Sequence, residues 1–183
     1  STIKKNLSEY MSTYNKDIPF KFHPNIRSSE ACYISSSNAI KLAQETNARL
    51  HVFHISTSIE VDLFNNDVPL SEKKITSEAC IHHLWFTDSD YEKLGSKIKW
   101  NPAIKSKKDQ DAIWDGINNN KIDIIATDHA PHLLTEKNQN YLSSPSGGPL
   151  VQHGLLALLT CHKKGKITLE KIVEKTCHNP AIL

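Results

Sequence analysis

The sequence predicts an α/β fold, because segments with strand character alternate along the chain with segments of helical character. The clearest strand is residues 122–127, Ile-Asp-Ile-Ile-Ala-Thr, and a helix over residues 106–119 directly precedes it. Strands that are separated by helices pair in parallel through right-handed crossovers. About three or four such strands are too few to close an eight-stranded barrel, which typically takes roughly 250 residues. The sheet is therefore either small and open or part of a barrel.

The N-terminal elements follow from the spacing of apolar residues and from capping residues. Residues 1–14 place apolar side chains at helical spacing. Residues 28–47 predict a helix with Ser28 or Ser29 as its N-cap. Residues 49–55 are rich in β-forming side chains and predict a strand that is buried on both faces, and a helix follows at residues 58–65.

The remaining elements repeat this alternation. The helix at residues 106–119 begins with a capping box in which Asp109 takes the place of the usual glutamate and Ser106 is the N-cap. The others are, in chain order, a strand at residues 74–80, a short extended piece at residues 97–100, the strand at residues 122–127, a loop at residues 143–149 and two closing helices at residues 151–163 and 168–177.

Composition and charge limit the classes of function. The 22 basic and 20 acidic residues give a net charge of +2 and form no basic stripe, so no nucleic-acid partner is expected. No run of about 18 apolar residues and no signal peptide is present, so we expect no membrane insertion and a cytoplasmic location. The four cysteines make no Cys-x-x-Cys pair, which argues against a structural zinc site or a disulfide framework.

The run Thr-Asp-His-Ala-Pro-His at residues 127–132 is the strongest candidate for chemistry. It follows the clearest strand, and active sites of parallel α/β folds assemble at the C-terminal ends of strands. Asp128 could hold a metal ion and accept a proton from a metal-bound water, while His132 could extend toward a substrate. The alternative is that Asp128 caps a following helix and that the histidines are surface residues.

Residues 125–132, Ile-Ala-Thr-Asp-His-Ala-Pro-His, resemble the end of the last barrel strand in the dihydroorotase branch of the amidohydrolase superfamily. Further segments are similar to that family in the same order along the chain: residues 23–31, 50–57, 75–84, 99–105 and 177–181. The resemblance covers almost the whole chain. It implies that residues 1–183 are one partial domain, the C-terminal half of a (β/α)8 TIM-like barrel with strands six to eight and their helices.

The resemblance also implies an activity: zinc-dependent, reversible hydrolysis of the cyclic amide of dihydroorotate to carbamoyl aspartate in pyrimidine biosynthesis. His54 is then a zinc ligand, and Asp128 is both a zinc ligand and the general base that shuttles a proton to the leaving nitrogen. The same resemblance places Asn101, His132 and Gly147 on the substrate. Without this context, His54 would more often be a hydrogen-bonded core histidine.

Three other histidines receive no catalytic role. Strand alternation sends His51 to the face opposite His54, so we expect it to be a packing residue. The adjacent pair His82 and His83 would diverge on an extended segment, and the resemblance marks the pair as structural.

Most of the binuclear Zn²⁺ site that the resemblance implies would lie outside this chain. The family takes further ligands from a His-x-His pair on strand one, a bridging acid or carboxylated lysine on strand four and a histidine on strand five. Two protein ligands are fewer than the three that a catalytic zinc normally needs, so we expect the chain alone to bind metal poorly and to be inactive. Lys105 also stands where the family usually has arginine, and it could not make a bidentate contact with a carboxylate.

Two other functions stay open. A hydantoinase or allantoinase shares the barrel and the metals, although Asn101 and the sequence of residues 128–132 favour dihydroorotase. A catalytically silent dihydroorotase-like subunit could serve as a scaffold for a transferase of the same pathway. The expected partner is a small molecule, dihydroorotate or carbamoyl aspartate, and a homodimer is left open.

Overall fold

The computed structural model describes residues 1–183 and contains one three-stranded sheet in the order β1-β2-β3. Strand β1 (Leu50–Val52) pairs with β2 (Ile75–Cys80), and β2 pairs with β3 (Ile124–Ala126), in both cases in parallel. Helices connect the strands, as parallel pairing requires. The predicted α/β class with parallel strands is confirmed.

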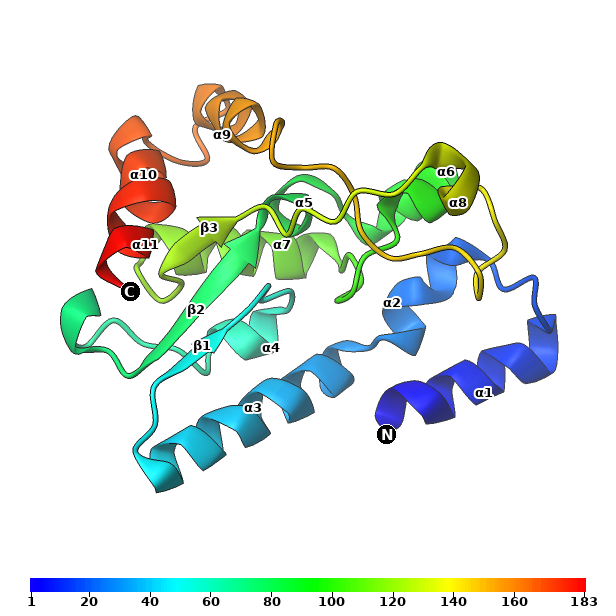
Figure 1. The fold of residues 1–183 in the computed structure, drawn as a ribbon, viewed down its shortest axis with the longest axis horizontal. Coiled ribbons are helices and arrows are strands. Elements are labelled where there is room, and N and C mark those ends of the chain that lie inside the picture. The colour runs from blue at the N-terminus through cyan, green and yellow to red at the C-terminus, as the bar shows by residue number, and fades with distance from the viewer.

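The helices lie around this sheet. In Figure 1, α1 and α3 lie on the side of β1, whereas α9, α10 and α11 lie on the side of β3 with the C-terminus. None of the helices is both long enough and apolar enough to cross a membrane. The α-helices are α1 (Thr2–Tyr14), α2 (His23–Ile26), α3 (Ser29–Thr46), α4 (Ser58–Val61), α5 (Ile81–Trp85), α6 (Tyr91–Leu94), α7 (Lys107–Asn118), α8 (Leu134–Lys137), α9 (Gly154–Lys163), α10 (Leu169–Val173) and α11 (Asn179–Ile182). Short 3₁₀ turns occur at Phe20–Phe22, Leu70–Glu72, Asp88–Asp90 and Gly95–Ile98, and Glu174–His178 forms a π-helical turn.

The predicted helix starts are confirmed where a capping side chain marks them. The Ser28 hydroxyl accepts a hydrogen bond from the Ala31 N–H at 3.3 Å and starts α3. Ser106 and Asp109 form the predicted capping box at the start of α7, each side chain accepting from the other residue's backbone N–H. Caps depend on neighbours in sequence, which explains why they could be predicted.

Several elements differ from the prediction, among them the strand predicted over residues 122–127, which spans only Ile124–Ala126. The strand predicted over residues 49–55 spans only Leu50–Val52, and all three residues are half-buried because β1 has a neighbouring strand on one side only. The helix predicted at residues 58–65 ends at Val61. Residues 97–100 are not simply extended, because Gly95 ends α6 with a φ of +52° and a 3₁₀ turn follows as far as Ile98.

The main core lies on one face of the sheet. Ala79 and Ile125 from the strands pack with Ile113, Ile117 and Leu158 from α7 and α9 in a cluster of 16 buried residues. Because strand residues alternate between faces, the neighbours of Ala79 point to the other face. That other face carries the polar side chains of Thr76 and Glu78 beside Ile124 and Ala126.

His51 belongs to this polar face, so the prediction that it is a packing residue is corrected. Its Nδ1 lies 2.8 Å from the Thr76 hydroxyl and its Nε2 lies 3.2 Å from a Glu78 carboxylate oxygen. Thr76 and Glu78 are two residues apart on β2, so their side chains lie on the same face. Because β2 pairs with β1, each of the two ring nitrogens of His51 has a polar partner there.

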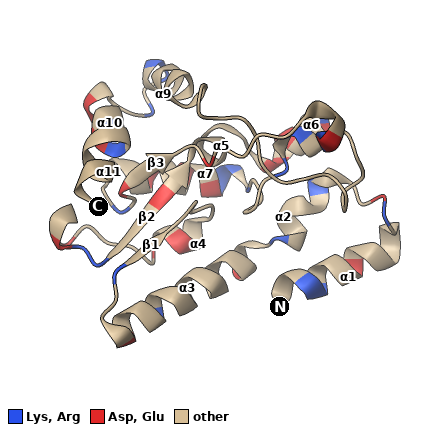
Figure 2. Cartoon of the chain, in the orientation of Figure 1, with Lys and Arg blue, Asp and Glu red and all other residues tan.

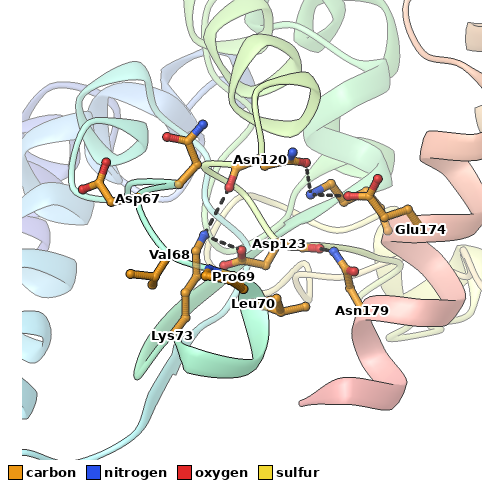
Figure 3. Close-up of a pocket in the computed structure, with 11 residues that line it drawn as sticks. Asp67, Val68, Pro69, Leu70, Lys73, Asn120, Asp123, Glu174 and Asn179 are labelled. Carbon is orange, nitrogen blue, oxygen red and sulfur yellow. Dashed lines mark hydrogen bonds and ion pairs between the residues drawn. The ribbon is translucent and has the colours of Figure 1, made fainter.

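A polar network closes the sheet at the N-terminal ends of its strands (Figure 3). The Lys73 ammonium lies 2.7 Å from the buried Asp123 carboxylate, which also accepts the Ser77 N–H at 3.0 Å. Asn179 donates to the Asp123 carbonyl at 2.7 Å and so ties α11 to the sheet. Lys73, Asp123 and Asn179 line a cavity of about 430 Å³. Because these residues pair with one another, we interpret this end of the sheet as structural.

Candidate functional site

Three side chains occupy the same position relative to the three strands. His54, His82 and Asp128 each stand two residues beyond the last residue of β1, β2 and β3, respectively. Parallel strands end at the same edge of a sheet, so these residues gather at one edge. This edge is opposite the network around Asp123.

His54 and Asp128 both adopt a left-handed backbone conformation, with φ of +44° and +47°. This conformation costs roughly 1–2 kcal/mol for an L-residue and is uncommon outside glycine. Non-glycine residues that are held this way cluster at functional sites, where the surrounding structure enforces them. This conformation ends the extended backbone that follows β1 at His54 and the one that follows β3 at Asp128.

Cys80, His82 and Asp128 bring three types of metal-ligating atom together. The thiol, an imidazole nitrogen and a carboxylate oxygen all lie within 4.8 Å of one another. Burial lowers the pKa of His82 to about 3, so its ring is neutral and able to coordinate a cation. Burial and the charges of Glu78 and Asp128 raise the pKa of the Cys80 thiol, which therefore stays protonated without a metal.

His82 lies at this edge as well, although its place in the sequence gave it no predicted role in the site. Its ring is fully buried, stacks on Trp100 at 4.6 Å with an interplanar angle of 6°, and neither ring nitrogen has a hydrogen-bond partner. The expected divergence from His83 fails because the two residues lie on α5, where their rings are 4.2 Å apart. Its position two residues past β2, shared with His54 and Asp128, is the signal that could have found it.

His54 and Asn101 line one cavity of about 440 Å³ between α3 and β1, together with Arg27 and Glu60. The Asn101 side-chain oxygen is buried and has no hydrogen-bond partner. The structure thus brings a predicted metal ligand and a predicted substrate contact to the same hollow. An orphaned amide oxygen there is available to a bound molecule.

Gly147 is required by close packing between loops. A Cβ atom on Gly147, whose φ is +133°, would lie 2.7 Å from the Cβ and the carbonyl oxygen of Ala130. The Gly147 N–H donates to the Lys99 carbonyl at 2.9 Å. A substrate contact through that N–H would need this bond to open, and the predicted role of Gly147 on the substrate stays a prediction.

His132 is joined to the same loop. Its Nε2 lies 3.2 Å from the Ser146 carbonyl, and its Nδ1 lies 3.9 Å from the Glu136 carboxylate. The ring is half-buried. Residues 129–132, 99–101 and 144–148 therefore form one connected group of loops at the C-terminal edge of the sheet.

His23 supports this group from α2. Its Nε2 lies 2.7 Å from the Trp100 carbonyl and its Nδ1 lies 2.7 Å from the Tyr141 hydroxyl. Burial lowers the pKa of His23 to about 3, so a neutral ring with one donor and one acceptor nitrogen joins the two segments. His23 thus fixes the residue that precedes Asn101.

The sequence relatives of this chain include dihydroorotases. No family model matches the chain. Over 181 residues the chain is 35% identical to the dihydroorotase of Methanosphaera stadtmanae, an alignment that covers 98% of this chain and 39% of the relative. It is 37% identical over 141 residues to the dihydroorotase of Ruminiclostridium cellulolyticum, covering 76% of this chain and 33% of that protein. The chain is related to the dihydroorotases. The predicted resemblance is confirmed.

Solved structures agree at the level of the fold. An L-hydantoinase (dihydropyrimidinase) from Arthrobacter aurescens superimposes with a TM-score of 0.85 at 22% identity, covering 98% of this chain and 40% of that one. The dihydroorotase from Saccharomyces cerevisiae, solved with 5-fluoroorotic acid, gives a TM-score of 0.72 at 16% identity, covering 80% of this chain and 41% of that one. The chain spans between a third and two fifths of the length of its dihydroorotase relatives.

Proposed function

We propose that this chain is the C-terminal half of the (β/α)8 barrel of a dihydroorotase, which reversibly hydrolyses dihydroorotate to carbamoyl aspartate in pyrimidine biosynthesis. The observation that carries the proposal is the convergence of His54 and Asp128 at the C-terminal edge of a parallel sheet, in a chain related to dihydroorotases. In this proposal residues 1–183 supply strands six to eight as one partial domain.

The open side of the sheet supports the half-barrel proposal. Strand β1 has a neighbour on one side only, and the cavity beside it exposes Phe53 and half-buried His54. A parallel sheet usually has both faces covered and its edges protected. In a complete barrel, strand five would pair with this edge and strand one would pair with the free edge of β3.

The donor set at this edge fits a zinc ion. Nitrogen, oxygen and sulfur atoms are its usual ligands, and neither ring nitrogen of the buried His82 has a hydrogen-bond partner within the chain. Asp128 from this cluster and His54, which lies at the same edge of the sheet but outside the cluster, would hold the binuclear Zn²⁺ site together with ligands from outside this chain. When bound, such ions polarise the scissile carbonyl and lower the pKa of water.

The chain's own residues divide the remaining work. Asp128 accepts a proton from the attacking water and delivers it to the leaving ring nitrogen, as a carboxylate at this position can do. Asn101 and His132 orient the substrate, and Gly147 lets the 144–148 loop approach it closely. A cytoplasmic location and a homodimeric assembly stay predictions.

A hydantoinase is the second candidate, because hydantoinase structures share this fold closely. Identity to the solved structures does not separate the two candidates, since it is 18–24% for the hydantoinases and dihydropyrimidinases and 16% for the dihydroorotase, but the sequence relatives at 30–38% identity are dihydroorotases. A catalytically silent scaffold subunit is the candidate from another class.

The test uses the complete protein that carries this chain, purified with zinc. Hydrolysis of dihydroorotate and formation of dihydroorotate from carbamoyl aspartate are followed by chromatography, with hydantoin and allantoin as competing substrates. We expect turnover of the first pair only, and two zinc ions per chain by elemental analysis. Preferential turnover of hydantoin or allantoin would support the second candidate, and zinc-loaded protein without any turnover would support the scaffold.

A further inference from the structure

Two buried lysines tie together the loops of the candidate site. The Lys137 ammonium donates to the carbonyls of Lys99, Pro145 and Gly147 at 3.2, 3.0 and 2.9 Å. The Lys99 ammonium donates to the carbonyls of Tyr141 and Ser144, both at 2.6 Å. Five backbone carbonyls are thereby held by two side chains, and four of them belong to residues 141–147.

Neither lysine has an acidic partner. No carboxylate lies within 4.0 Å of the ammonium of Lys99 or Lys137, although ten other pairs in the chain meet that limit. The charged groups that shift their pKa values are cationic. Arg27 lowers the pKa of Lys99, and Lys99 lowers the pKa of Lys137. Burial lowers the pKa of both lysines to about 8, so both remain mostly charged at neutral pH.

This lack of counter-charge is local. Over the chain, acidic and basic residues are interspersed, as Figure 2 shows, and the net charge is only +2. A buried charge without a counter-ion is unfavourable for folding unless polar groups solvate it, and here backbone carbonyls do so. In a poorly solvated region its field is screened weakly and reaches neighbouring groups.

The two lysines stand close to the predicted substrate contacts. The Lys137 ammonium lies 5.8 Å from the centre of the Trp100 ring, and Trp100 directly precedes Asn101. Lys137 also fixes Gly147, and the neighbouring Ser146 carbonyl contacts His132. The positive charge is therefore carried by the scaffold that positions Asn101 and His132.

We propose that Lys99 and Lys137 determine substrate specificity by positioning: they fix the 144–148 loop against Trp100 and give this edge an uncompensated positive charge that favours cyclic amides bearing a carboxylate over neutral rings. The inference rests on the proposed function and deepens it. Dihydroorotate carries such a carboxylate, whereas the ring of hydantoin is uncharged. A fold shared with hydantoinases could in this way select a different ring.

The test compares charge-removing and charge-keeping variants of the complete protein. Lys99→Gln and Lys137→Gln keep a hydrogen-bond donor but remove the charge, Lys137→Arg keeps the charge, and Lys16→Gln removes an exposed charge as the matched control. We expect each buried Gln variant to raise the KM for dihydroorotate about tenfold with kcat within about twofold. Lys137→Arg should keep the preference for the anionic substrate because it keeps the charge, and Lys16→Gln should resemble the wild type.

Binding provides a readout that does not need turnover. Calorimetry with orotate, an anionic ring, and with uracil, a neutral one, should show that Lys137→Gln weakens binding of orotate alone. Equal weakening for both rings, or a lower kcat with an unchanged KM, would reduce the lysines to structural supports and overturn the inference. A wild-type protein that binds orotate in a lysine-dependent way but does not hydrolyse dihydroorotate would overturn the proposed function alone.

Discussion

His54 and Asp128 reach the same edge of the sheet through backbone conformations that sequence patterns do not reveal. Both residues could be predicted as candidates from residue type and from their place after a strand. Their left-handed φ values could not, because such values depend on packing from distant segments. His82 was missed for the same reason, since its place beside Asp128 depends on α5 and on the stacking with Trp100.

The contacts of His132 lead to a prediction about substrate binding. Replacing His132 with alanine in the complete protein removes a half-buried ring that contacts the Ser146 carbonyl but belongs to no metal-ligating cluster. We expect the KM for dihydroorotate to rise about tenfold or more while the zinc content stays at the wild-type value. Steady-state kinetics with elemental analysis on the same sample measures both. Loss of zinc from this variant would show that His132 acts as a ligand.

At the scale of single elements, capping residues predicted where a helix starts, whereas the length of a strand could not be predicted from its own residues. The start of α7 was predicted because Ser106 and Asp109 satisfy N–H groups within one turn. The extent of β1 was not, because a strand's length and burial depend on the strands beside it. The same holds for α4, which stops at Val61 and packs against α7.

The capping box of α7 gives a prediction about stability. Ser106→Ala removes the side chain that accepts the Asp109 N–H, and we expect the free energy of unfolding to fall by about 1 kcal/mol. Asp109→Ala should cost more, since its carboxylate also accepts the Ser58 N–H at 2.8 Å and so joins α7 to α4. Urea unfolding measures both, with Ser12→Ala on the exposed surface of α1 as the control. Equal effects of the three substitutions would contradict the assigned role of the box.

At the scale of the whole molecule, the alternation of strands and helices was enough to predict a parallel α/β sheet. The choice between an open sheet and part of a barrel was not settled by alternation, because closure depends on strands that lie outside these 183 residues in the proposed barrel. The resemblance at residues 125–132 was what predicted part of a barrel. Relatives in which the chain covers no more than 39% of the length are consistent with it.

Buried neutral histidines predict how stability depends on pH. Burial lowers the pKa of His23 to about 3 from an ordinary value of 6.5, so below pH 6.5 the unfolded chain binds a proton that the folded chain does not. Stability contributed by the neutral ring is thus complete above pH 6.5 and is lost as the pH falls toward 3, by about 1.4 kcal/mol per pH unit. Burial shifts the pKa of His82 and His83 in the same direction.

Urea unfolding of the complete protein between pH 7.5 and 5 tests this prediction. The free energy of unfolding should decrease as the pH falls, and His23→Gln should give a flatter dependence because one titrating group is gone. A stability that is constant or increases over this range would contradict the neutral, buried state of His23.

The most direct test of the proposed chemistry replaces Asp128 with asparagine in the complete, zinc-supplemented protein. Asparagine is nearly isosteric, so the fold should persist, but it cannot accept the proton that a general base must take. The measurement is kcat for dihydroorotate hydrolysis, with the circular dichroism spectrum as the check on folding. We predict a loss of about a thousandfold or more with an unchanged spectrum. Turnover near the wild-type rate in the folded variant would contradict the assignment of Asp128 as the base.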